Sequence, residues 1–432
     1  MSRRVSVRMR SRRGSSSVFL CVILSALVSI CFALIWSTIE YTTDSRADAL
    51  MNLAGDSLLS EFDTDIHREY GLFLLHTPDS DLTSHLRGYL TYTFGGEDHV
   101  TLSDIHASGA GFTATDMEAM RNQILTYMKA GGALHLPGQS TSGGADGSAS
   151  GSADGSSSGG DSIIPGADAG HSLRHGPTIA SLPSRQLPEQ DLLSRAMSFG
   201  SRLSDLGGVF SDGTNQFLLG SYVLGNFNSN TVNADPDHFF YREVEYILNG
   251  ELTDQENRRK TAGALKMLRF SSNMVHIYTD VEKRDALAAA AEVIAPGPGA
   301  PAVQAALAAA WAYAESANDA ELLLRGHRVP LIKDDENWAI SLENVIEDTD
   351  GDHVVLPDRD AGLTYSQYLR ILLFLEDEDM ITARIMDLIQ INMRKNVDGD
   401  FLISECCWGI TLGAGINGRN HSYEKLYQQK PQ

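Results

Sequence analysis

The sequence predicts an α+β fold in which helices predominate, with a single transmembrane helix near the N-terminus. Three observations carry this prediction. Residues 18–36 are apolar and uncharged, apolar residues recur at helical spacing through most of 237–395, and the alternation typical of strands is confined to short stretches such as 99–113 and 408–414. We therefore expect a membrane helix followed by a mainly helical body.

The apolar segment Val18–Trp36 contains 19 residues and no charge. A helix of this length spans about 28 Å, close to the thickness of the hydrocarbon core of a bilayer. Residues 1–17 carry six arginines and no acid, whereas Glu40, Asp44 and Asp48 follow the segment. The positive-inside rule then predicts a single-pass protein of the cell membrane with a cytoplasmic N-terminus and an extracellular body.

Two other kinds of leader fit this segment less well. A cleaved secretory signal needs small residues before its cleavage site, and residues 36–46 contain no A-x-A pattern. A lipoprotein leader needs a small residue before its cysteine, but Cys21 follows a leucine and Cys31 an isoleucine. We expect the segment to be retained.

The residues just before the segment look like a prepilin leader. Gly14 follows two arginines and precedes hydroxyl residues and the apolar helix, so Gly14 and Ser15 are a candidate processing site. Such leaders usually place glutamate at the fifth mature position, and Phe19 stands there in this chain. Processing at Gly14 and a plain uncleaved anchor both remain open at this point.

Apolar residues beyond the span line one face of a helix. They are Ala47, Met51, Ala54, Leu58 and Phe62. Residues 18–66 contain no proline and a single glycine, Gly55. One continuous helix of about 50 residues fits this pattern, and so does an ordinary juxtamembrane helix packed on its own domain.

Composition divides the chain into five regions. Residues 1–17 are a basic cytoplasmic N-terminus, 18–36 the transmembrane helix, 37–136 a juxtamembrane helix with a small α/β unit, 137–185 a flexible Ser/Gly-rich insert, and 186–432 a mainly helical body. The body ends in a predicted strand pair.

Local patterns predict the elements of these regions. In the α/β unit we expect a buried strand over 70–75, helices over 81–94 and 114–132, and strands within 99–113. In the body, the pairs Thr253 with Glu256 and Thr364 with Gln367 predict capping boxes that open helices, the first helix running through Phe270. Two alanine-rich helices, 280–294 and 301–326, are expected to form a hairpin around a Pro/Gly-rich turn.

The net charge and the absence of common motifs exclude several classes of function from the prediction. The formal net charge is −22, and beyond the basic N-terminus the chain holds 28 basic against 56 acidic residues. Such a surface repels phosphate backbones, so we expect no nucleic-acid binding. The chain has no HExxH, G-x-S-x-G, phosphate-binding or dinucleotide-binding motif, and we expect neither catalysis nor a cofactor.

Two acidic loops are candidates for calcium. Their ligand residues are Asp348, Asp350 and Asp352 in one loop, and Asn396, Asp398 and Glu405 in the other. The first loop fails the EF-hand register, and the second has an arginine at the first ligand position. The alternative for both loops is a solvated turn.

Three further residues have a chemical and a structural interpretation. Glu315, next to aromatic residues on an alanine-rich helix, is expected to pair with a lysine or arginine in the core rather than to act as an acid. Cys406 and Cys407 are adjacent, form no metal-binding pattern, and are expected to pack as small apolar residues.

Runs along most of the chain resemble a known family. They include "EYGLF" at Glu69, "QILTYMK" at Gln123, "VEYILNG" at Val244, "GLTYSQYLRILLFLED" at Gly362 and "MDLIQINMR" at Met386. These resemble uncharacterised single-pass membrane proteins of Gram-positive bacteria that are encoded with tight-adherence (Tad) pilus machinery and carry a domain of unknown function. The N-terminus is similar to that of TadE- or TadG-like pseudopilins.

The resemblance implies a structural or assembly component of a Tad-like type IV pilus or secretion system in the cell envelope, with other subunits of that system as partners. It implies no catalytic residue, metal or cofactor. The alternative function is a tethered surface binding module, an adhesin or ligand sensor, with no role in a pilus.

Overall fold

The computed structural model describes residues 13–96, 100–131, 170–173, 176–188, 214–232, 237–347, 354–357, 359 and 361–427. The chain forms two compact units. The sheet unit comprises Met1–Glu61, Thr77–Phe112 and Gly409–Gln432, and the helical unit comprises Phe62–His76 and Thr113–Trp408. The predicted class, α+β with helices predominating, is confirmed.

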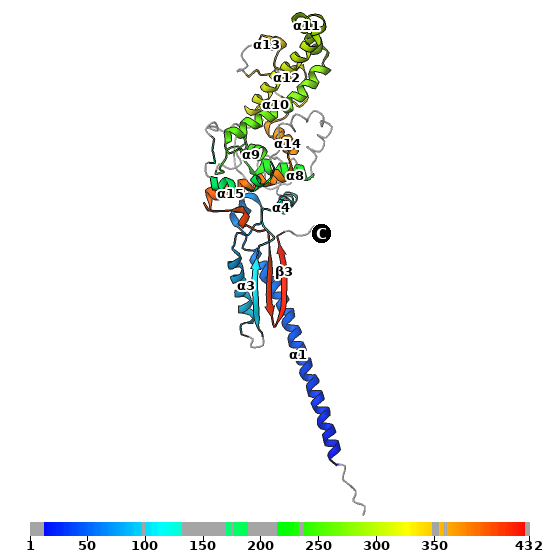
Figure 1. Ribbon diagram of the computed structural model, residues 1–432, viewed down its shortest axis with the longest axis vertical. Coiled ribbons are helices and arrows are strands. Elements are labelled where there is room, and N and C mark those ends of the chain that lie inside the picture. The colour runs from blue at the N-terminus through cyan, green and yellow to red at the C-terminus, as the bar shows by residue number, and fades with distance from the viewer. Residues whose placement is uncertain are drawn as a thin grey trace, which may run out of the picture. The chain divides into compact units, whose positions relative to one another are not determined.

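The sheet unit is built on α1 (Arg13–Leu59), a single helix of 47 residues (Figure 1). Four of the five residues predicted to share one face do so, since Ala47, Met51, Ala54 and Leu58 are at most 2% exposed, whereas Phe62 lies beyond the end of α1. Gly55 lies on the packed half, where a Cβ would stand 2.7 Å from side-chain atoms of Leu412 and Lys425. The helix therefore approaches the sheet closely along this face.

The continuous helix ends earlier than expected, at Leu59 rather than near residue 66. A separate helix, α2 (Thr64–Tyr70), begins after Asp63. The Asp63 carboxylate accepts hydrogen bonds from the backbone N–H groups of Asp65 and Ile66, which makes it the N-cap of α2. Residues 64–70 therefore form a separate helix and do not continue α1.

The sheet has three antiparallel strands in the order β1 (Leu102–Ser108), β2 (Gly409–Ile416), β3 (Arg419–Leu426). The β2–β3 hairpin turns through Asn417 and Gly418, both with positive φ, as a two-residue turn of this kind requires. The predicted C-terminal strand pair is thus confirmed. The pair joins β1, and so belongs to the sheet unit rather than to the helical body.

Helix α3 (Asp79–Phe94) packs on β1 through Leu82, Leu86, Leu90 and Phe94, all buried. The Thr83 hydroxyl donates to the Ala107 carbonyl and accepts from the Ala107 N–H, which joins the helix to the strand. The helix predicted over 81–94 is present, and of the strands predicted within 99–113 the described residues form one, β1.

The helical unit has one main core around α15 (Glu378–Asn396). Every residue of α15 from Met380 to Met393 is buried, as expected for a helix surrounded on all sides. Around it lie α2 and the helices α4 (Met117–Lys129), α8 (Asn215–Asn226), α9 (Glu243–Asn249) and α14 (Tyr365–Leu375), with 3-10 turns at Pro183–Gln186 and Ile403–Glu405. The short helix α5 (Gly176–Ala180) precedes the first of these turns.

The predicted helical hairpin is also present in this unit. Helix α10 (Asp254–Thr279) lies beside α12 (Ala300–Leu324), and α11 (Val281–Ile294) packs on both (Figure 1). Short turns complete it at Gly297–Gly299, Asp335–Asn337 and α13 (Leu342–Ile346). A second, smaller core holds these helices together through Ile277, Leu287, Ala308, Trp311, Ala312 and Leu342.

Three local predictions differ from the structure. The segment 70–75 is no sheet strand, because Gly71 ends α2 with φ 69° and only a single bridge, Leu75 to Cys407, follows. Helix α10 continues past Phe270 because no breaker intervenes before Asp280. Most of the predicted insert 137–185 lies outside the described residues, but its end is ordered, with Leu182 fully buried.

Both predicted capping boxes mark helix starts, and the complete box forms at one of them. Thr364 and Gln367 exchange both hydrogen bonds of the box at α14. At α10 the Thr253 hydroxyl accepts from the Glu256 N–H. These signals are local, so they can be recognised without any tertiary context.

We predict that Gly362→Ala destabilises the chain by about 2 kcal/mol. Gly362 has φ 121°, and a Cβ there would lie 2.2–2.5 Å from backbone atoms of Val329 and Pro330, which cannot move aside. Chemical denaturation of the detergent-solubilised chain, followed by tryptophan fluorescence, measures the change.

The matched control is Gly263→Ala. Gly263 lies inside α10, and nothing stands within 4 Å of the place that a Cβ would take, so alanine there is expected to stabilise the chain by about 0.5–1 kcal/mol. Equal effects of the two substitutions would contradict the strain argument.

Candidate functional site

The N-terminal half of α1 is an apolar surface that the protein itself does not cover. Its best 18-residue window has a mean hydropathy of 3.0 and no residue of it is buried. Val18, Phe19, Leu20 and Trp36 are each at least 65% exposed. In length and composition the helix fits a single membrane span, and it is the one candidate span among the described residues.

The hydroxyl residues of this half do not interrupt its apolar character. The Ser25 hydroxyl donates to the Val22 carbonyl and the Ser29 hydroxyl to the Ser25 carbonyl. Each polar hydrogen is therefore bonded inside the helix, which is what a hydrocarbon surrounding demands.

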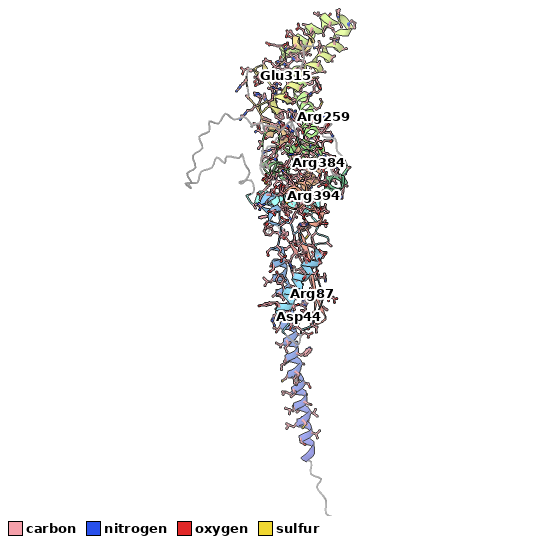
Figure 2. All side chains as sticks on the ribbon, turned by 90° about the vertical axis from the view of Figure 1, so that its left-hand side faces the viewer. Asp44, Arg87, Arg259, Glu315, Arg384 and Arg394 are labelled. Carbon is pink, nitrogen blue, oxygen red and sulfur yellow. The ribbon has the colours of Figure 1, made fainter. Side chains whose placement is uncertain are left out.

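The other half of α1 is joined to β3 by a row of polar contacts that we call the charged seam. Its members are Glu40, Asp44, Asp48 and Asp56 on α1 and Arg419, His421, Tyr423 and Lys425 on β3. Asp44 is labelled on α1 in Figure 2.

The seam's contacts follow the helix and the strand in step. Arg419 bonds to Glu40 at 3.0 Å and also to Asp44. Asp48 accepts from His421 Nδ1 at 2.8 Å and from the Tyr423 hydroxyl. Further along, Lys425 Nζ bonds to Asp56 at 2.8 Å, and the Tyr427 hydroxyl donates to the Leu59 carbonyl at 2.6 Å.

The contacts stay in step because the helix and the strand rise by similar amounts between successive contacting residues. Four residues of an α-helix rise about 6 Å, and two residues of a β-strand rise about 6.7 Å. Acids four apart on α1 therefore meet alternate residues of β3 over several turns before the two repeats drift out of step.

Sequence reasoning misses the seam, although its signal is present. Glu40, Asp44 and Asp48 are spaced by four, and basic and aromatic residues alternate along 419–427. From the sequence alone, these acids indicate only that the residues after the membrane span lie on its outer side. Their pairing with residues near the C-terminus is visible only in the structure.

The candidate calcium residues are not joined into one site by the described contacts. Asp348, Asp350 and Asp352 lie outside the described residues. Asn396 ends α15 and donates to the Asp237 carbonyl at 3.4 Å, whereas the Asp398 carboxylate accepts from the Asp400 N–H at 3.0 Å. Glu405 is exposed in a 3-10 turn.

The candidate processing site lies at the beginning of α1. The helix starts at Arg13, so the backbone of Gly14 and Ser15 is helical. The cysteines fall into two classes: Cys21 and Cys31 are exposed on the apolar half, whereas Cys406 and Cys407 are buried and unbridged. Burial raises the pKa of the Cys406 thiol, as expected for a packing residue.

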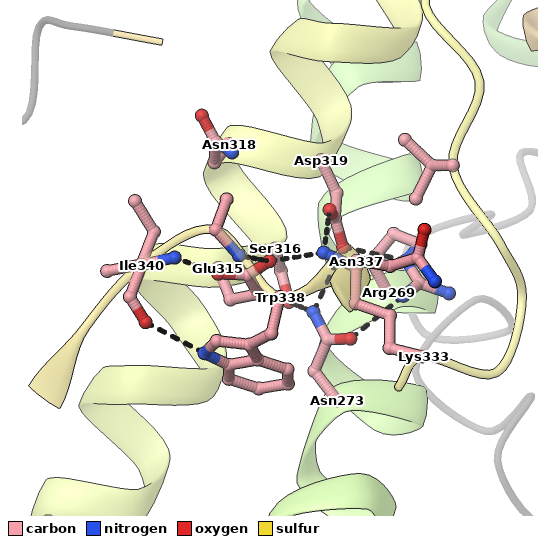
Figure 3. Close-up of polar contacts among 12 residues, drawn as sticks. Arg269, Asn273, Glu315, Ser316, Asn318, Asp319, Lys333, Asn337, Trp338 and Ile340 are labelled. Carbon is pink, nitrogen blue, oxygen red and sulfur yellow. Dashed lines mark hydrogen bonds and ion pairs between the residues drawn. The ribbon is translucent and has the colours of Figure 1, made fainter. Parts of the chain in front are cut away.

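Glu315 belongs to a buried ionic cluster in the helical unit (Figure 3). It pairs with Lys333, which also bonds to Asp319 at 2.6 Å, and Asp319 in turn accepts from Arg269 Nε at 2.9 Å. The backbone N–H groups of Ala339 and Ile340 donate to Glu315 at 3.0 and 2.7 Å. Two cations thus balance two carboxylates, and the predicted pairing of Glu315 is confirmed.

The cluster joins segments rather than presenting a reactive group. All four charged side chains are at most 1% exposed. Burial raises the pKa of Glu315, and the Lys333 ammonium offsets part of that rise. The cluster links α10, α12 and the segment 333–340, and a substrate has no access to it.

A second polar centre surrounds His238. Its ring nitrogens bond to Glu69 at 2.7 Å and Glu243 at 2.5 Å, and Asn392 donates to Glu243 at 2.7 Å. Burial opposes protonation, but hydrogen bonds to the two carboxylates outweigh it and raise the pKa of His238 to about 10. The ring is an imidazolium at neutral pH and cannot serve as a general base there.

A hollow of about 870 Å³ opens beside this centre. Its walls are Asp65, Arg68, Glu69, Asp237, Asn396 and Val397. The wall carboxylate that contacts the centre, Glu69, is already bonded to His238. Glu69 thus belongs both to this polar centre and to the wall of the hollow.

We predict that the charged seam weakens in acid through Asp48. Hydrogen bonds from Tyr423 and His421 lower the pKa of Asp48. A depressed pKa means that this contribution is complete above the unfolded value of about 3.9 and is lost as pH falls through the lower folded value. Amide hydrogen exchange of β3 should therefore accelerate below about pH 4 relative to other strands.

The variant Asp48→Asn should flatten that pH dependence, since it carries no titrating carboxylate. Asp65→Asn, in the helical unit, is the control and should leave the exchange of β3 unchanged. An identical pH profile in wild type and Asp48→Asn would refute the assignment.

We also predict that Lys333→Met destabilises the helical unit by about 3–5 kcal/mol, because it leaves Glu315 and Asp319 buried without that cation. The control is Arg325→Ala, which removes an exposed pair with Glu321 and should cost about 0.5 kcal/mol. Denaturant unfolding compares them. Adding Glu315→Gln to Lys333→Met should recover part of the loss.

Comparison with known proteins identifies a family but no close relative. A model described as a family of unknown function (DUF5702) matches residues 176–418, more than half of the chain. No curated protein and no solved structure matches. The match begins at α5 and ends in the β2–β3 turn, so α1 lies outside it. On this match the chain belongs to the DUF5702 family, whose function is unknown.

Proposed function

We propose that this protein is a membrane-anchored structural or assembly component of a Tad-like type IV pilus or secretion system, with its body outside the cell. The observation that carries the proposal is the construction of α1. One unbroken helix presents an uncovered apolar surface along its first half and packs on a sheet along its second half.

Because α1 is one unbroken helix, a lateral contact at its apolar half would affect the position of the sheet. A contact made by the apolar half with a neighbouring helix constrains the sheet that the other half carries, because no hinge separates them within α1. A flexible tether would transmit no such constraint. The arginines before the span favour a cytoplasmic N-terminus, which leaves the sheet and the helical unit outside.

A tethered surface binding module is the second candidate. The observation that favours it is a group of exposed apolar side chains on the α10–α11 part of the hairpin. They are Val275, Tyr278, Val281, Val293 and Ile294, with exposures from 46 to 84%. A binding module would use those of them that adjoin one another as a contact surface, without lateral contacts at the apolar half.

Crosslinking at the two exposed cysteines tests the proposal. Cys21 and Cys31 are ten residues apart, so on an α-helix they point about 80° away from each other. We expect single-cysteine chains in native membranes to form adducts with other envelope subunits more strongly at one of these positions than at the other. A chain with both residues changed to serine is the control.

The buried pair Cys406 and Cys407 should remain unreactive and so needs no replacement. Absence of adducts at both Cys21 and Cys31 would contradict the proposal, as would wild-type pilus assembly after deletion of the gene. If the chain instead retains ligand binding at a cell surface under those outcomes, the second candidate is favoured.

A further inference from the structure

Three side chains of metal-ligand type meet where α10 gives way to α11. His276 is in the last turn of α10, Asp280 is the N-cap of α11, and Asp335 begins the 3-10 turn Asp335–Asn337. Each offers a ligand atom, and these atoms all lie within 4.8 Å of one another. Three segments of the helical unit thus converge on one point.

The His276 imidazole has a ring nitrogen that could bind a metal ion. Its Nε2 is buried and has no hydrogen-bond partner among the described residues. A buried polar atom without a partner is costly, and a bound cation would remove that cost.

The two carboxylates already attract a positive charge. Lys283 Nζ bonds to Asp335, lies 3.7 Å from Asp280 Oδ2, and sits 5.1 Å from the centre of the Trp338 ring. One ammonium balances only one of the two negative charges. A divalent cation would balance both, and the lysine could keep its contact with the Trp338 ring.

We propose that His276, Asp280 and Asp335 form a binding site for a divalent transition-metal ion of the zinc class, which displaces the Lys283 ammonium from between the two carboxylates. One imidazole nitrogen with two carboxylate oxygens is a ligand set that Zn²⁺ accepts at about 2.0–2.2 Å. Calcium and magnesium prefer oxygen ligands alone. Three protein ligands leave a fourth position for water.

The bound ion would act as a clamp on the hairpin. It would join the α10–α11 junction to the turn at Asp335, which is otherwise attached there through Lys283. Because the ion binds the folded chain, it should raise the Tm of the helical unit as its concentration increases.

Zinc titration of the full-length chain in detergent tests this site. The affinity of the tightest site is measured by competition with a chromophoric chelator, and Trp338 fluorescence reports on binding because its ring lies 5.2 Å from that of His276. We expect His276→Ala and Asp280→Asn each to weaken binding by about tenfold or more. Asparagine still caps a helix, so Asp280→Asn preserves the start of α11.

Lys283→Met provides a test in the opposite direction. It removes the competing cation but keeps an apolar stem of similar length, so Zn²⁺ should bind more tightly and raise the Tm further. His85→Ala removes an exposed histidine that is paired with Glu61 in the sheet unit, and should change neither quantity. The proposal is overturned if either ligand variant binds Zn²⁺ as wild type does, or if Lys283→Met binds it no more tightly.

Discussion

The packing of one helix on one sheet determines how the N-terminal part of this protein is built. The second half of α1 covers β2 and β3 with a face of small and medium apolar residues, and Gly55 allows the close approach. The charged seam then sets the register, because its partners repeat at nearly the same interval on helix and strand. Apolar burial supplies most of the free energy of this contact, since exposed ion pairs contribute little individually.

The helical unit differs from the sheet unit in that it buries many charged and polar side chains. Arg269, Lys333, Glu315 and Asp319 balance one another, and His238 bridges two glutamates. Such groups are costly unless every partner is present, and here they connect segments that are distant in sequence. Losing any one partner would leave another buried charge unpaired, so these groups favour the arrangement of helices that keeps all of them together.

Local chemistry explains what could be predicted from the sequence. The capping box of Thr364 and Gln367, the turn between α11 and α12, and the apolar face of α1 each depend on residues within a few positions of one another. The pairing of Glu315 followed from the cost of burying a lone carboxylate. The identity of the partner, Lys333, could not be predicted, because it depends on how α12 packs against the segment after α12.

Contacts between residues far apart in the sequence explain the features that could not be predicted from it. The segment at 70–75 has the composition of a strand, but Gly71 and the helix before it leave only one bridge. No periodicity connects Asp48 with His421 or places β1 beside β2. The cluster of His276, Asp280 and Asp335 has no sequence signature for the same reason, because Asp335 approaches through a turn far along the chain.

The order of the strands has a consequence for biosynthesis. Thr101, at the edge of β1, donates to Asn417, which lies 316 residues later in the chain. The central strand of the sheet therefore leaves the ribosome long after α1, which could by then have entered a bilayer. Until then the second half of α1 lacks the strands β2 and β3 that it covers, whereas α3 and its partner β1 are already present. The helix is made long before the strands that cover it, and its exposed apolar face during that interval is a natural point of contact for a chaperone.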